Sequence, residues 1–145
     1  MSLKSLVTPG LVSCSLETPV WEVAKKMQEQ EVGAVLITSE GKPRGIVTDR
    51  DLVLRCLVKK LDPELTTVEE VMTPSVETIA ESEGLFGAIR ALQRGSVRRI
   101  VIVDEAGSPC SLLSFDDVFE VLAEELGYLK DVVKPTSTKI QTTAA

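Results

Sequence analysis

The sequence predicts a mixed α/β (α+β) fold in which two β-α-β-β-α repeats pack together with pseudo-two-fold symmetry. Two features of the 145-residue chain support this prediction: an internal repeat and an alternation of two local patterns. Short runs of branched apolar residues are typical of buried strands, and apolar residues at i, i+3, i+4 and i+7 are typical of helices with one buried face. Each copy leaves an apolar face open, so we expect the copies to bury these faces against each other.

The internal repeat is found by comparing the sequence with itself. The offset is 65 residues at first and becomes 66 after one extra loop residue. Identical or chemically similar residues then coincide: Thr8 with Thr73, Ile37 with Ile102, Gly41 with Gly107, Thr48 with Ser114, and Asp51 with Asp117. The apolar classes match along the whole alignment, which indicates a duplicated unit.

In the first copy, a helix is predicted to begin at Pro19, because the missing N–H of proline does no harm at the first helical position. Thr18 is its candidate N-cap. Its apolar stripe consists of Val20, Val23, Ala24 and Met27. Branched residues and turn-forming residues then predict strand 34–37, turn 39–43, strand 45–47 and helix 49–59.

The second copy repeats this order. Its predicted elements are helix 83–94, strand 99–103, turn 105–109, strand 111–113 and helix 115–126. Between the copies, Asp62-Pro63 marks a break, and Thr67 can cap a short helix. We therefore divide the chain into a first repeat (5–60), a linker with a short helix (61–72), a second repeat (73–127) and a flexible, polar, Thr-rich C-terminal tail (128–145).

Composition narrows the classes of function. Histidine is absent, so the commonest general base near neutral pH and the commonest metal ligand are missing. The three cysteines form no CxxC pair, which excludes a zinc knuckle and a thioredoxin-type site. A net charge of −6 and five aromatic residues argue against nucleic-acid binding. No nucleophile–base pair or Walker-type glycine loop is present, so we expect a non-catalytic protein without cofactor or metal.

No apolar run approaches the ~18 residues that a membrane span requires, and the N-terminus lacks a basic-then-apolar signal peptide. We therefore expect a cytoplasmic protein that does not contact membranes.

Several motifs, taken in order and twice over, resemble a known family. They are GIVTDRDL at 45–52, SLLSFDDV at 111–118, the Met72-Thr73-Pro74 opening of the second copy, and the strands led by Val32 and Val97. Over roughly residues 5–127 the chain resembles a tandem pair of CBS (cystathionine β-synthase) domains, a Bateman module, of the stand-alone kind. The resemblance implies that an adenosine nucleotide binds in clefts between the two copies.

The residues at the first strand–helix junction suit such a ligand. Thr48 can hold a phosphate at the positive end of the helix dipole, and the Asp51 carboxylate can accept both ribose hydroxyls. On spacing alone, the two residues serve equally well as a helix cap and a first-turn acid. Gly45 leaves room for a purine beside the strand. The resemblance places the strand that begins with Arg98 and Arg99 across this cleft, where one guanidinium is expected to reach the phosphate.

Two clefts follow from the duplication. The first-ranked nucleotide cleft comprises Gly45, Ile46, Thr48, Arg50, Asp51, Thr78, Ile79, Val97, Arg98 and Arg99. The second comprises Ser13, Cys14, Val32, Gly33, Ala34, Leu112, Ser114, Asp116 and Asp117. It has Ser111 where glycine is usual in the family, and the facing Gly33-Ala34 brings no positive charge. We therefore expect it to favour a neutral nucleoside or to stay empty.

The leading hypothesis is a regulatory module that binds AMP, or ADP or ATP, and signals energy state to an unidentified protein partner in trans. One alternative is a binder of S-adenosylmethionine or methylthioadenosine, and another is a ligand-free dimerisation scaffold. A homodimer is expected through apolar helix faces that include Trp21, Val118, Val121 and Leu122.

Overall fold

The computed structural model describes Leu3 and residues 10–144, of which residues 134–144 are described by their backbone alone. The first repeat contains β1 (Ser13–Ser15), α1 (Val20–Gln30), β2 (Ala34–Ser39), β3 (Lys42–Thr48), α2 (Asp49–Leu52) and the π-helical turn η2 (Val53–Leu57). The connection to the second repeat contains α3 (Val68–Val71) and β4 (Thr73–Pro74). The second repeat contains β5 (Thr78–Ala80), α4 (Leu85–Gly95), β6 (Arg99–Val103), β7 (Pro109–Ser114) and α5 (Phe115–Ala144). The predicted β-α-β-β-α order is confirmed in both copies.

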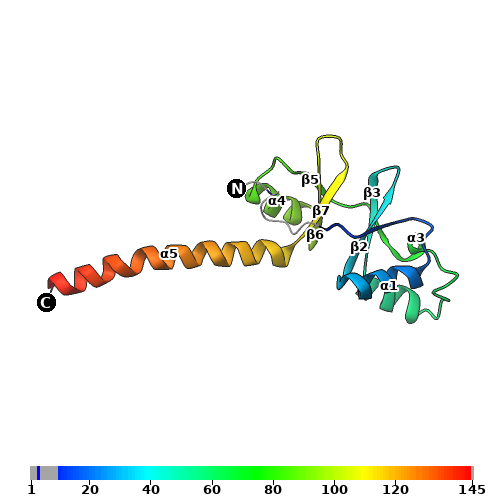
Figure 1. The fold of residues 1–145 in the computed structure, drawn as a ribbon, viewed down its shortest axis with the longest axis horizontal. Helices are drawn as coiled ribbons and strands as arrows, with labels where there is room; N and C mark the ends of the chain where they lie inside the picture. The colour runs from blue at the N-terminus through cyan, green and yellow to red at the C-terminus, as the bar shows by residue number, and fades with distance from the viewer. Residues whose placement is uncertain (1–2, 4–9, 145) are drawn as a thin grey trace.

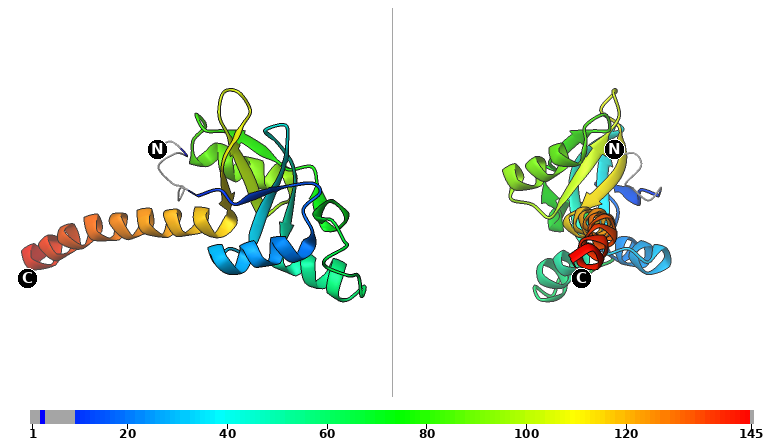
Figure 2. Two further views of the ribbon diagram at one scale, coloured as in Figure 1. Left: turned by 45° about the vertical axis from the view of Figure 1, so that its right-hand side comes forward. Right: turned by 90° about the vertical axis from the view of Figure 1, so that its left-hand side faces the viewer.

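Each repeat has its own sheet, and the two sheets lie side by side (Figures 1 and 2). In the first sheet, β1 is parallel to β2, β2 is antiparallel to β3, and β4 adds to the edge of β3. The second sheet has the order β5-β6-β7 with the same sense of pairing. Helix α5 leaves the second repeat and projects away from both sheets.

Fine details of the backbone repeat at the same positions in both copies. The ladder is irregular between Ile37 and Thr38 and again between Ile102 and Val103. Helices α1 and α4 both end at a residue in the left-handed conformation, Glu31 and Ser96. The duplication read from the sequence therefore extends to bulges and caps.

Two hydrophobic cores fill the space between each sheet and its helices. The first contains residues from β1, α1, β2, β3, η2 and α3, and the second contains residues from β5, α4, β6, β7 and α5. Leu36 and Val101 are fully buried and belong to neither core. Because alternate strand residues point to opposite faces, these two lie on the sheet faces opposite the cores, where the repeats meet.

The two repeats exchange short segments at their beginnings. Val68 and Val71 of α3, which precede the second copy, are buried in the first core. Leu3, which is equivalent to Val68 at the offset of 65, is buried in the second core, and its N–H donates to the Glu83 carbonyl. Each core is therefore completed by residues from outside its own repeat.

The prediction that Thr18 caps α1 is wrong. The N-cap residue is Pro19, and the Thr18 hydroxyl instead lies 3.1 Å from the Ser15 hydroxyl. The free N–H groups at the start of the helix donate to the linker, from Val20 to the Thr66 carbonyl and from Trp21 to the Pro63 carbonyl. The linker thus supplies the acceptors that a capping side chain would otherwise provide.

The helices that end each repeat differ from their predicted lengths. The helix predicted over 49–59 is α-helical to Leu52 and continues as the π-helical turn to Leu57, with the Val58 N–H bonded to the Val53 carbonyl. The helix predicted over 115–126 runs on as α5 to Ala144. The boundary placed at 128 therefore falls inside a helix, because the residues after Leu126 include the good helix formers Leu129 and Lys130.

Candidate nucleotide-binding clefts

Each repeat contains one junction at which a strand runs directly into a helix. At the end of β3, the Asp51 amide donates to Thr48 Oγ1 at 3.2 Å, and the Thr48 amide donates to Asp51 Oδ2 at 2.9 Å. Ser114 and Asp117 form the same pair of bonds where β7 meets α5, at 3.1 and 2.8 Å. Both junctions are therefore capping boxes, so the capping role considered for Thr48 is realised in the fold.

The first junction lines a cavity of about 220 Å³ between the repeats. The cavity brings together six of the residues predicted for the first-ranked cleft: Ile46, Thr48, Asp51, Val97, Arg98 and Arg99. Asp51 is mostly buried there, and its Oδ1 lies 3.8 Å from the Arg55 Nε. A carboxylate, a hydroxyl and two guanidinium groups thus share one cavity, as a ribose and a phosphate would require.

Four residues predicted for this cleft lie outside its lining. A Cβ at Gly45 would lie 2.5 Å from Met72 Sδ and 2.8 Å from the Thr73 carbonyl oxygen. The space beside Gly45 is therefore filled by the chain entering β4, and the expectation that it admits a purine is wrong. Ile79 is buried in the second core. Thr78 lines a separate cavity with residues of α4, and Arg50 is exposed on α2.

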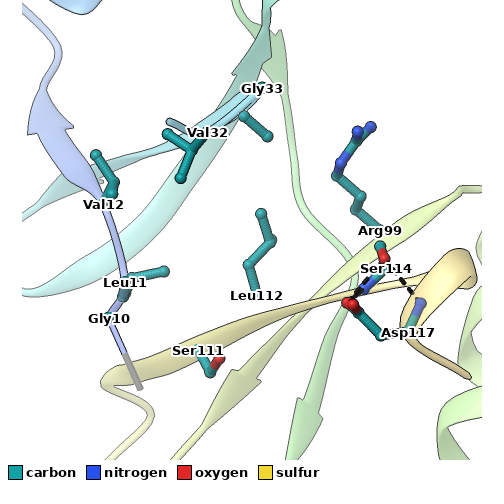
Figure 3. Close-up of a pocket in the computed structure, with 11 residues that line it drawn as sticks. Gly10, Leu11, Val12, Val32, Gly33, Arg99, Ser111, Leu112, Ser114 and Asp117 are labelled. Atoms are coloured by element: carbon teal, nitrogen blue, oxygen red, sulfur yellow. Dashed lines mark hydrogen bonds between the residues drawn. The ribbon is translucent and has the colours of Figure 1, made fainter. Parts of the chain in front are cut away.

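The second junction lines a larger cavity of about 380 Å³, shown in Figure 3. It brings together six of the residues predicted for the second cleft: Val32, Gly33, Ala34, Leu112, Ser114 and Asp117. Most of its lining is apolar, and the Ser114–Asp117 pair supplies a hydroxyl and a carboxylate at one end. Ser111 also lines this cavity.

Three residues predicted for the second cleft lie outside its lining. Cys14 is buried in the first core, and this burial raises the pKa of its thiol above the ordinary value. The Ser13 carbonyl accepts a hydrogen bond from the Lys26 ammonium at 2.9 Å. Asp116 is exposed and forms an ion pair with Arg98 at 3.6 Å.

Arg99 changes the expected electrostatics of the second cleft. It pairs with Ser114 across the ladder of β6 and β7, and it lines both cavities. The expectation that the second cleft lacks positive charge is therefore wrong. Arg98 and Arg99 both line the first cleft, and the Arg98 guanidinium is ion-paired with Asp116.

Sequence reasoning missed the segments that enter each repeat. Ser75, Val76 and Glu77 line the first cavity together with Thr73. Gly10, Leu11 and Val12 line the second. These two triplets are equivalent at the offset of 65. The internal repeat therefore predicts that, if one triplet lines a cleft, its counterpart lines the other cleft.

Among the described residues, no group of three or more Cys, Asp or Glu side chains is placed to hold a metal ion. Within the same part of the chain, no helix has the length and apolar character needed to cross a bilayer. The polar chemistry of the two clefts thus rests on hydroxyls, carboxylates and guanidinium groups.

Comparison with known proteins identifies the family. The CBS domain model matches residues 3–57 and 68–124, so the chain belongs to the CBS domain family and is a tandem pair of CBS domains. The chain is 33% identical over 103 residues to CBS domain-containing protein CBSCBSPB3 of Arabidopsis thaliana, which covers 71% of this chain and 18% of that protein. It is 32% identical over 106 residues to the protein MK0525 of Methanopyrus kandleri, covering 72% of this chain and 54% of that protein. The chain thus spans at most about half the length of these relatives.

Solved structures share the fold. CBS domain protein PAE2072 of Pyrobaculum aerophilum, complexed with AMP, superposes with a TM-score of 0.71 at 22% identity and covers 81% of this chain and 89% of that one. The CBS domain pair of protein MJ0100, in complex with 5'-methylthioadenosine and S-adenosyl-L-methionine, gives a TM-score of 0.72 at 20% identity, covering 84% and 99%.

Proposed function

We propose that this CBS domain pair is a non-catalytic regulatory module that binds an adenosine nucleotide, AMP in preference to ADP or ATP, between its repeats. The observation that carries the proposal is the position of Arg99, which lines both clefts, each of which also contains a hydroxyl–carboxylate pair. The carboxylate suits the ribose hydroxyls and the guanidinium suits the phosphate. The structural neighbour PAE2072, which is complexed with AMP, supports the same ligand class.

The two clefts are proposed to differ in their preferred ligand. The first contains Arg98 as well as Arg99, which favours a charged phosphate. The second, at about 380 Å³, lies within the ~300–1,000 Å³ typical of small-molecule sites. Its apolar lining of Leu11, Val12 and Leu112 favours the neutral thioether of methylthioadenosine, which is the second candidate ligand, with the sulfonium S-adenosylmethionine as its related alternative.

Isothermal titration of AMP, adenosine and ATP tests the proposal. We expect AMP to bind about tenfold to a hundredfold more tightly than adenosine, since charge-assisted hydrogen bonds contribute ~1.5–3 kcal/mol. Equal affinities for AMP and adenosine would favour the thioether class. Absence of heat with all three ligands and with methylthioadenosine would overturn adenosine binding and leave the dimerisation scaffold.

A matched pair of variants assigns the cleft. Asp51→Ala removes the ribose acceptor of the first cleft and should weaken AMP binding about tenfold to a hundredfold, whereas Asp117→Ala removes its counterpart in the second. An AMP affinity that falls only in Asp117→Ala would move the nucleotide to the second cleft.

The proposed readout is a change in how the module contacts a protein partner, and the module is proposed to be a homodimer through its helical faces. Trp21 on α1 is half exposed, and Val121 and Leu122 on α5 are partly exposed. Val118 was expected to contribute to this face, but it is buried in the second core and is therefore not available. Light scattering at micromolar concentration tests the dimer, and a monomer mass would exclude it.

A further inference from the structure

The far part of α5 carries an apolar stripe that the two repeats do not cover. Val118 and, in part, Leu122 anchor the start of the helix on the second core. Beyond them the helix projects from the body (Figure 1), yet the stripe continues. Phe119, Leu126, Leu129 and Val133 are between 61% and 66% exposed. Large apolar side chains in this number on one helix face indicate an interaction surface.

The spacing of the stripe is that of a coiled coil. Phe119, Leu122, Leu126, Leu129 and Val133 follow one another at intervals of three, four, three and four residues. These are the a and d positions of two heptads, with leucine at both d positions and β-branched Val133 at an a position. We call these five residues the α5 seam. A stripe with this spacing fits a second helix of the same kind.

The charged residues beside the seam favour pairing with a second copy of α5 and a parallel direction of the two helices. With Phe119 at position a, Glu125 occupies position g and Lys130 occupies position e, five residues later. In a parallel pair, position g of one helix faces the e position five residues later on the other, so Glu125 of each copy meets Lys130 of the next. In an antiparallel pair, g faces g and e faces e, and this attraction is lost.

From these observations we infer that α5 pairs with α5 of a second copy of this chain as a parallel coiled coil along the α5 seam. The charge of residues 115–133 argues against a membrane as the partner of this helix. These residues contain six Asp or Glu and one Lys, which disfavours an anionic lipid surface. The inference deepens the homodimer proposed above, and it does not depend on the ligand. Two heptads are short for an isolated coiled coil, so the experiments use the full chain.

The first experiment compares neighbouring exposed residues. Leu129→Glu places a charge in the seam, whereas Tyr128→Glu places the same charge at position c, where the side chain is 67% exposed and outside the seam. Sedimentation equilibrium should show a dimer dissociation constant that Leu129→Glu raises at least tenfold and Tyr128→Glu leaves unchanged. A dimer unaffected by Leu129→Glu would overturn the inference but keep the homodimer, and a monomeric wild type would overturn both.

A charge exchange tests the direction. Glu125→Lys and Lys130→Glu each bring like charges together in a parallel pair and should each raise the dissociation constant about threefold to tenfold, since two such pairs form per dimer. The double exchange restores opposite charges and should return the constant to within about twofold of the wild type. Failure of the double exchange to restore the dimer would overturn the parallel arrangement. Titration of AMP into the same variants should give the wild-type affinity, which separates this inference from the ligand proposal.

Discussion

At position 45, the absence of a side chain allows one segment of the chain to pass closely over another. Gly45 pairs with Pro74 at the edge where β4 joins the first sheet, and the side chain of Met72 occupies the space that a Cβ would need. The sequence predicts that the glycine in the GIVTDRDL motif leaves room for a purine. In the fold it serves the packing of the linker on β3.

Gly45→Ala should therefore destabilise the protein. A Cβ would approach the Thr73 carbonyl oxygen to 2.8 Å, and because this atom belongs to the backbone, β4 would have to shift. We expect a loss of about 1–3 kcal/mol in the free energy of unfolding, measured by urea denaturation. Gly127→Ala is the control, since nothing lies within 4 Å of its Cβ position on α5. Equal stability of Gly45→Ala and wild type would contradict the packing role.

At the scale of the element, the two capping boxes begin the helices that end each repeat. The same side chains that cap α2 and α5 line the two cavities. The structural and the ligand-binding interpretations of Thr48 and Asp51 are thus not exclusive, and stability and affinity must be measured on the same variants to separate them.

Thr48→Ala should lower the free energy of unfolding by about 1 kcal/mol, because the Asp51 amide loses its acceptor. Thr48→Ser keeps a hydroxyl at this position and should retain most of that stability. Urea denaturation of both variants without ligand provides the measurement. If Thr48→Ala proves as stable as wild type, the hydroxyl does not act as a cap, and its role would have to lie with the ligand.

At the scale of the whole molecule, the exchange of segments couples the two repeats. Leu3 is fully buried in the second core although it precedes the first repeat, and α3 completes the first core from the linker. Neither repeat holds a complete core of its own, so we expect the pair to unfold as one cooperative unit.

Leu3→Ala should cost about 2–5 kcal/mol of unfolding free energy, the usual range for truncating a buried leucine. Leu65→Ala is the matched control, since Leu65 is 82% exposed and its truncation leaves no cavity. Thermal and urea unfolding followed by circular dichroism would measure both. Two separate transitions in the wild-type protein, rather than one, would show that the repeats are not coupled.

The order of elements, the duplication and the two hydroxyl–carboxylate pairs could be predicted from the sequence because they depend on local patterns. Strand 99–103 was predicted at the bounds of β6, since Ile100, Val101 and Ile102 form an uninterrupted branched run. Asp51 and Asp117 follow their hydroxyl partners by three residues, and this spacing alone brings them to the same helix turn. The local pattern wrongly predicts Thr18 as a cap, because the acceptors for α1 come from residues more than forty positions away.

Local sequence patterns are therefore enough to predict the doubled unit and the chemistry that each copy carries. The positions of distant residues come from the packing in three dimensions: Arg99 lines both cavities, the entering segments line them too, Leu3 is buried in the second core, and Gly45 accommodates Met72. The difference arises from distance along the chain. Helix periodicity and turn chemistry act over a few residues, whereas these contacts join residues that only the packing of one repeat on the other brings together.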